Sequence, residues 1–158
     1  MMMKIKNENR KVEDMGILLF TDAKNNVLGK YLNVKKLDFS IDSLEEVDNY
    51  IEKTRKNKKK LTEEEIKRII LRCGAYLGEA IRKNSGGDII WISYEEGKKI
   101  NDQLEKTVIR DITTHLILYD SEKKRIWFPL AKVYKFLEHG REDNTWAFAM
   151  VCLEEHDR

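Results

Sequence analysis

The segment 62–84 constrains the fold more than any other part of this 158-residue sequence. It opens with Thr62 and Glu65, the capping-box spacing in which each side chain satisfies a free backbone N–H at a helix start. At 100° per residue, one apolar face covers about a third of the helix circumference. Its residues are Ile66, Ile69, Ile70, Cys73, Leu77, Ala80 and Ile81. We therefore expect a long central helix with partners on two sides.

Two glycines, Gly74 and Gly78, lie beside this apolar face. Each costs about 1 kcal/mol of helix propensity relative to alanine. A phosphate-binding loop would place its glycines before a helix, where backbone N–H groups are free. These two lie inside the helix, and Gly86 and Gly87 follow its C-terminal end, where the dipole repels phosphate. The spacing predicts close packing at Gly74 and Gly78 and a helix stop at Gly86 and Gly87.

Helices are also predicted before and after this segment. Residues 12–28 carry an apolar stripe at helical spacing, and a hairpin is the alternative; we favour the helix. A Ser/Thr-x-x-Glu pattern at Ser43 predicts a helix that begins at 44 and continues to 56, with Glu46 completing the capping box. The same pattern at Ser93 and Glu96 predicts a helix over 94–106, which Gly97 weakens.

Three segments have the composition of strands. Residues 88–93 are rich in β-branched and aromatic side chains, and 113–119 and 125–128 flank the polar sequence DSEKK. The last two segments are predicted to form a hairpin. We therefore expect a small, mainly antiparallel sheet.

The C-terminal part is predicted to be helical again. Pro129 suits the first position of a helix, Gly140 suits a left-handed stop, and a last helix covers roughly 144–154. The predicted class is α+β, with N-terminal helices, a long central helix, the small sheet and two C-terminal helices. We expect residues 1–158 to form a single domain in which 1–11 are flexible.

The composition and the lack of a recognisable targeting signal predict a soluble, cytoplasmic chain. It is 37% charged and has two cysteines, Cys73 and Cys152, which both sit among apolar residues, as reduced buried thiols do. No apolar region follows the N-terminal positive charges, so no signal peptide is predicted. The longest apolar run, 146–153, is too short for a membrane span.

Metal binding and nucleophilic catalysis find little support in the sequence. Cys152 and His156 are one helical turn apart, and Cys73 and His115 are possible further ligands. However, no paired C-x-x-C spacing is present, and His156 is predicted to lie in a polar tail that frays. A dyad of Cys73 and His115 would need an exposed thiolate, which an apolar face does not supply. We predict no metal, no cofactor and no catalytic residues.

Arg72, Tyr76 and Glu79 form one stripe on the central helix and are the candidate binding residues. They would bind a polar ligand or partner, and Glu79 would be a base if the chain were an enzyme. The favoured interpretation is an exposed face tied by helix pairs such as Arg72 with Tyr76 and Tyr76 with Lys83. Six aromatic residues, three of them tryptophans, are expected to form a core beneath the sheet, and a ligand pocket lined by the same residues is the alternative. This group comprises Trp91, Trp127, Trp146, Phe128, Tyr134 and Phe136.

The basic run 53–60, KTRKNKKK, raises nucleic-acid binding as a further alternative. Acidic residues flank it on both sides, and no aromatic side chains are interleaved for base stacking. A solvated helix end is therefore the favoured interpretation, and nucleic acid is not the expected partner.

Three stretches together resemble a group of small bacterial proteins of unknown function. They are LDFSIDSLEEVDNYI (37–51), RCGAYLGEAIR (72–82) and WFPLAKVYKFLEHGRED (127–143), within a resemblance that covers about 37–145. The resemblance implies a bacterial, cytosolic α+β domain without an established activity or cofactor. Some members look like immunity-type partners of toxins. It transfers no functional residue.

The favoured function is non-enzymatic binding of another protein, in an immunity-like or regulatory role. It rests on the lack of a catalytic constellation and on segregated charge, which steers association. The alternatives are a small-molecule binder or enzyme near Arg72, Tyr76 and Glu79, and nucleic-acid binding through 53–60. The sequence leaves the oligomeric state open.

Overall fold

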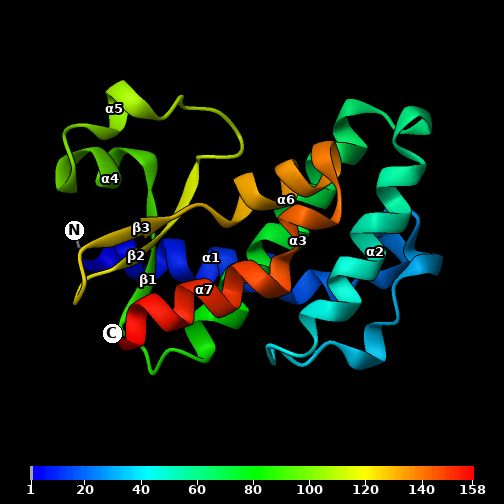
Figure 1. Ribbon diagram of the computed structural model, residues 1–158, viewed down its shortest axis with the longest axis horizontal. Helices are drawn as coiled ribbons and strands as arrows, with labels where there is room; N and C mark the ends of the chain where they lie inside the picture. The colour runs from blue at the N-terminus through cyan, green and yellow to red at the C-terminus, as the bar shows by residue number, and fades with distance from the viewer. Residues whose placement is uncertain (1) are drawn as a thin grey trace.

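A computed structural model describes the backbone of residues 2–158 and the side chains of 9–158 (Figure 1). The fold is α+β, as predicted. Along the chain, α-helices and strands follow in the order α1 (Met2–Thr21), α2 (Leu44–Lys56), α3 (Glu63–Lys83), β1 (Ile89–Ser93), α4 (Tyr94–Ile100), α5 (Leu104–Thr107), β2 (Leu116–Asp120), β3 (Arg125–Trp127), α6 (Pro129–His139) and α7 (Thr145–Asp157). Short 3-10 turns, η1 to η5, join several of them.

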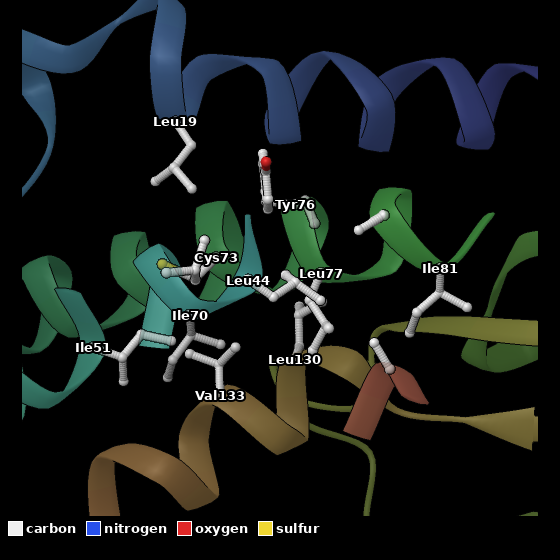
Figure 2. Close-up of a cluster of buried hydrophobic side chains, with 14 of the residues drawn as sticks. Leu19, Leu44, Ile51, Ile70, Cys73, Tyr76, Leu77, Ile81, Leu130 and Val133 are labelled. Atoms are coloured by element: carbon white, nitrogen blue, oxygen red, sulfur yellow. The ribbon is translucent and has the colours of Figure 1, made fainter. Parts of the chain in front are cut away.

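Helix α3 is the centre of the fold, and its glycines are points of close approach. Both hydrogen bonds of the predicted capping box form, between Thr62 and Glu65. A Cβ on Gly74 would lie 2.7 Å from Cγ and 2.9 Å from Cα of Leu130 on α6. A Cβ on Gly78 would lie 2.0 Å from Cζ2 of Trp91 on β1. The prediction of close packing is confirmed. Figure 2 shows Leu130 and Val133 of α6 facing α3.

The third partner of α3 is α1, which the sequence predicted only in part. The helix runs to Thr21, so the hairpin alternative is wrong, but the predicted helical stretch 22–28 is replaced by 3-10 turns. The chain leaves the helix because the Asn26 side chain donates to the Leu19 carbonyl at 2.7 Å, and Leu28 takes a left-handed conformation with φ of 50°. Residues 2–11 lie in α1; the single-domain and flexibility expectations stay predictions.

The start of α2 is correct, but its predicted capping box is wrong. Ser43 makes no capping hydrogen bond; its hydroxyl donates to the Ser40 carbonyl and lies 2.6 Å from the Tyr76 hydroxyl. Glu46 instead accepts from the backbone N–H of Asn33. Both side chains are therefore used for tertiary contacts.

The predicted helix 94–106 is broken in two. The Ser93 hydroxyl accepts from the Glu96 N–H at 3.1 Å, as expected of a cap. Asn101 then adopts an extended conformation, with φ of −136° and ψ of 103°, which ends α4 before α5 begins. In Figure 1 these two short helices lie with the sheet, at the end of the molecule away from α2.

The sheet is antiparallel in the order β1-β2-β3, and the predicted hairpin joins its last two strands. Helix α6 begins with Pro129 at its first turn, as predicted. Gly140 has a positive φ of 94° but a ψ of −159°, so it ends α6 without the left-handed conformation expected. The positive φ at this position still requires glycine, which has no Cβ to clash with the backbone.

The start of helix α7 is capped by Asn144, whose side chain accepts from the Ala147 N–H at 2.8 Å, and is also bound by a distant carboxylate. Asp48 on α2 is only 4% exposed and accepts from the Thr145 N–H at 2.7 Å, the Thr145 hydroxyl at 2.6 Å and the Trp146 N–H at 3.2 Å. Burial raises the pKa of Asp48, although these hydrogen bonds oppose the shift. The contact fixes α2 and α7 together at the point where free N–H groups favour an anion.

The two faces of the sheet belong to different clusters of apolar residues. Ile89, Trp91, Leu118 and Trp127 face the main core around α3. The alternate residues pack with Tyr94 of α4 and Leu104 of α5 in a second, smaller cluster. This group comprises Ile90, Ile92, Ile117, Tyr119 and Ile126.

The β1 edge of the sheet is closed by a side chain of α1. The Asn9 amide accepts from the Trp91 N–H at 2.9 Å and donates to the Trp91 carbonyl at 3.1 Å. It thereby takes the place that a peptide group of a neighbouring strand would occupy. None of the helices within residues 2–158 combines the length and apolarity that crossing a membrane requires.

Candidate functional site

The predicted binding residues of α3 lie inside the molecule. Arg72 donates to the Asp22 carboxylate at 2.6 Å and to the Asn26 side chain at 2.8 Å. The hydrogen bond from Arg72 is the main cause that lowers the pKa of Asp22. This guanidinium therefore holds the turn after α1 against α3.

Tyr76 is fully buried. Its hydroxyl accepts from the Phe39 N–H at 2.9 Å and contacts the Ser43 hydroxyl, and its ring stacks on Phe39 with centroids 4.7 Å apart. Burial raises the pKa of the phenol. Phe39 has a φ of 64°, so this contact fixes an uncommon backbone conformation of the segment before α2.

Glu79 is also fully buried. It accepts from the indole N–H of Trp91 at 2.8 Å and from Arg82 at 2.9 Å. The interpretation of Arg72, Tyr76 and Glu79 as an exposed face is therefore wrong. Each binds a different segment of its own chain, and a role in binding a ligand stays a prediction.

The residues considered for metal and thiol chemistry are not brought together. Cys73 and Cys152 are unpaired and buried, and burial raises the pKa of both thiols. His115 is exposed. His156, expected in a fraying tail, is instead 7% exposed within α7. That expectation failed because its partner, Asp120, is remote in the sequence.

His156 connects α7 to the sheet and to the end of α3. Its Nδ1 lies 2.7 Å from the Asp120 carboxylate, and its Nε2 lies 3.0 Å from the Ser85 carbonyl oxygen. The hydrogen bond to Asp120 is the main cause that raises the pKa of His156. Asp88 and Glu122 complete the one possible metal-ligand group found among the described residues, with ligand atoms within 4.8 Å. Asp88 and Glu122 are both exposed, and the two ring nitrogens of His156 already face protein oxygens.

The basic run lies at the end of α2 and in turn η4 (Lys58–Lys60). Arg55 pairs with Glu52 at 2.6 Å, and Lys58 pairs with Glu138 of α6. The run borders a cavity of about 590 Å³ whose other lining includes Ile66 and Leu137. Nucleic-acid binding at this surface stays a prediction.

The most apolar of the described cavities lies beside β3, between the segment 107–114 and α6. It has a volume of about 470 Å³. A second cavity, of about 540 Å³, lies toward α4 and α5 and shares Thr107, Val108, Ile126 and Phe128 with the first. We call the two together the β3 groove. Its first part is lined by Thr107, Val108, Ile109, Asp111, Thr114, Ile126, Trp127, Phe128, Ala131, Lys132, Lys135 and Phe148.

An exposed apolar residue and unpaired lysines border the β3 groove. Ile109 is 81% exposed, the largest value among the large apolar side chains described. Lys132 pairs with Asp143 at 2.9 Å. Within the described residues, no carboxylate forms an ion pair with Lys124 or Lys135. Asp111, which lines the first cavity, likewise has no ion pair within the described residues. The two unpaired lysines therefore outnumber the one unpaired carboxylate, and the rim carries a small excess of positive charge.

The sequence indicated only part of this groove. The pocket alternative for the aromatic residues included Trp127 and Phe128, which both line it. Trp91 and Phe136 are core residues as expected, whereas Tyr134 is 44% exposed and does not belong to a core. The segment 107–111 had no predicted role, although the apolar pair Val108 and Ile109 within a polar stretch was a signal.

Comparisons of the chain with protein-family models, with curated proteins and with solved structures find no match. The resemblance to a group of small bacterial proteins therefore stays a prediction, and the geometry of the site carries the functional argument.

Proposed function

We propose that this chain is a non-enzymatic protein-binding domain, of regulatory or immunity-like type, that receives a segment of its partner in the β3 groove. The observation that carries the proposal is the groove itself. Its two cavities each have the volume of typical binding sites, about 300–1,000 Å³. They are joined along one strand, so the groove is elongated and suits a polypeptide segment.

The charged residues of the groove favour binding over catalysis. Asp111 is occupied by hydrogen bonds from the N–H and hydroxyl of Thr113, and Lys132 is occupied by Asp143. General acid–base chemistry needs groups that face a reacting atom instead of one another. We also propose a cytoplasmic location, since buried, unpaired thiols such as Cys73 and Cys152 suit a reducing compartment.

The proposal is tested by panning a displayed random-peptide library against the purified chain. A groove-blocked variant, Ala131→Glu, serves for counterselection, because Ala131 lies in the lining and is partly exposed. Glutamate is compatible with this first turn of α6. We expect enriched peptides that bind the wild-type chain at least about tenfold better than the variant, which corresponds to 1.4 kcal/mol.

A matched control makes the result specific to the groove. Ala147 occupies the corresponding third position of α7, is also partly exposed, and does not line the groove. Ala147→Glu should leave peptide binding unchanged. Failure to enrich any peptide, or equal binding by Ala131→Glu, would contradict the proposed function.

A further inference from the structure

We infer that the partner segment binds as an additional β-strand on the free edge of β3 and carries carboxylates on both sides of an apolar centre. This inference rests on the proposed function and specifies its partner. Its evidence is the direction of the backbone groups of β3, the position of the two cavities and the charge of the rim.

The direction of the β3 backbone follows from the contact at the opposite edge. Trp91 directs its N–H and carbonyl outward to Asn9, so it cannot direct them toward Leu118, the residue opposite it on β2. Hydrogen-bonded and non-bonded pairs alternate in an antiparallel ladder. Leu118 therefore bonds to the other side, toward Trp127, which lies opposite it on β3.

The same alternation turns the next residue outward. Ile126, adjacent to Trp127, directs its N–H and carbonyl away from β2 and toward the free edge. No hydrogen bond from elsewhere in the described chain reaches these two groups, and β2 is the only element that packs extensively along β3 within residues 2–158. Ile126 also lines both cavities of the β3 groove. An extended polypeptide is the ligand that pairs with such groups.

The two cavities suit the alternating side chains of a strand. A residue opposite Ile126 would direct its side chain to the same face of the sheet, toward Leu104 and Ile100 in the second cavity. Its neighbours would point to the other face, toward Ala131 and Phe148 in the first cavity. Both cavities are bordered by apolar side chains, so apolar residues are expected at successive positions of the segment.

The excess of positive charge at the rim, two unpaired lysines against the one unpaired carboxylate of Asp111, favours an acidic partner. Lys124 borders one cavity and Lys135 the other, and neither has an ion pair within the described chain. Carboxylates at the two ends of the bound segment would neutralise them. A second copy of this chain would instead bring two sets of unpaired lysines to one interface, and like charges oppose pairing.

The test uses the full chain and the peptide acetyl-Glu-Thr-Val-Val-Val-Thr-Glu-amide. One comparator has lysine at both ends, and another has N-methylated central valine, which cannot donate a backbone hydrogen bond. Loss of one such bond should weaken binding about tenfold. Charge reversal should weaken binding by roughly threefold to tenfold in low salt, and less in high salt.

A protein variant supplies the reciprocal evidence. Ile126→Pro removes the outward N–H and leaves the ladder to β2 intact, since that N–H is not part of it. It should weaken peptide binding about tenfold, whereas Ile126→Val should retain affinity. Because proline can also disturb folding, the thermal melting of the variant is compared with that of the wild type. The N-methylated peptide gives an answer that does not depend on any variant.

The outcomes separate this inference from the proposed function. If library peptides bind in the groove and backbone N-methylation does not weaken their binding, strand addition is overturned and the proposed function stands. Equal binding of the lysine-flanked peptide would overturn the acidic partner, as would self-association through β3 in sedimentation experiments. If neither the library nor the designed peptide binds, both proposals fail. Protection of the Ile126 amide from hydrogen exchange by the acidic peptide supports both.

Discussion

The two sides of the sheet are packed in different ways. On the main-core side, Trp91 lies so close to α3 that Gly78 has no room for a side chain. On the other side, Gly97 of α4 faces the movable ends of Leu104 and Ile117, and the β3 groove borders the layer. We infer from this contrast that the sheet can accommodate another chain on the side where packing depends on flexible side chains and not on rigid rings and backbone.

The substitution Gly78→Ala is expected to have the largest effect on the main-core side of the sheet. The added Cβ would stand 2.0 Å from Cζ2 of a fully buried indole, so the ring and β1 must shift. We expect a loss of about 3 kcal/mol or more in the free energy of unfolding, measured by urea denaturation. A loss below about 1 kcal/mol would show that the main core is as adaptable as the other layer.

The second test removes the carboxylate by which α2 binds the start of α7. Asp48→Ala would leave two backbone N–H groups and the Thr145 hydroxyl without their acceptor. We expect the free energy of unfolding to fall by about 2 kcal/mol. The free energy of unfolding should fall less in Asp48→Asn, which keeps one acceptor oxygen. Equal stability of the alanine variant and the wild type would contradict a structural role for this buried carboxylate.

A third substitution, Asn9→Ala, opens the β1 edge. It leaves the Trp91 N–H and carbonyl without the amide that satisfies them, and should cost about 1 kcal/mol of unfolding free energy. The Trp91 amide should also exchange faster with deuterium. Arg10→Ala, at the exposed neighbouring position of α1, controls for helix propensity. If the Trp91 amide exchanges at the same rate in Asn9→Ala and in Arg10→Ala, the Asn9 side chain does not protect this edge.

The smallest effect is expected for Gly97→Ala, the matched change in the other layer. The Cβ would lie 2.9 Å from Cδ2 of Leu104 and 3.1 Å from Cδ1 of Ile117, and both ends can rotate. Alanine gains about 1 kcal/mol of helix propensity, so the net change should stay within about 1 kcal/mol of zero. A cost equal to that of Gly78→Ala would remove the distinction between the two sides.

The elements with local signals were predictable from the sequence. Three features of this kind each follow from residues of a single helix. They are the capping box at Thr62, the start of α6 at Pro129 and the small residues Gly74 and Gly78 of α3. The hairpin between β2 and β3 likewise has its signal in one short polar turn. In each case the residues that decide the structure lie within a few positions of one another.

The candidate site depended on partners that are remote in the sequence. Arg72, Tyr76 and Glu79 were expected at the surface because polar side chains on a helix usually face water. Each is buried because a different distant residue satisfies it. The β3 groove depends on where the segment 107–114 passes over the sheet, which no local periodicity indicates.

The burial of the two thiols has a practical consequence. Cys73 lies on α3 and Cys152 on α7, and burial keeps both protonated and shielded from reagents. Modification by a thiol reagent in excess therefore requires that the surrounding structure first open. The rates at the two positions, resolved by mass spectrometry, would report the opening of the central helix and of the C-terminal helix separately. The chain thus contains two native reporters of its own local unfolding.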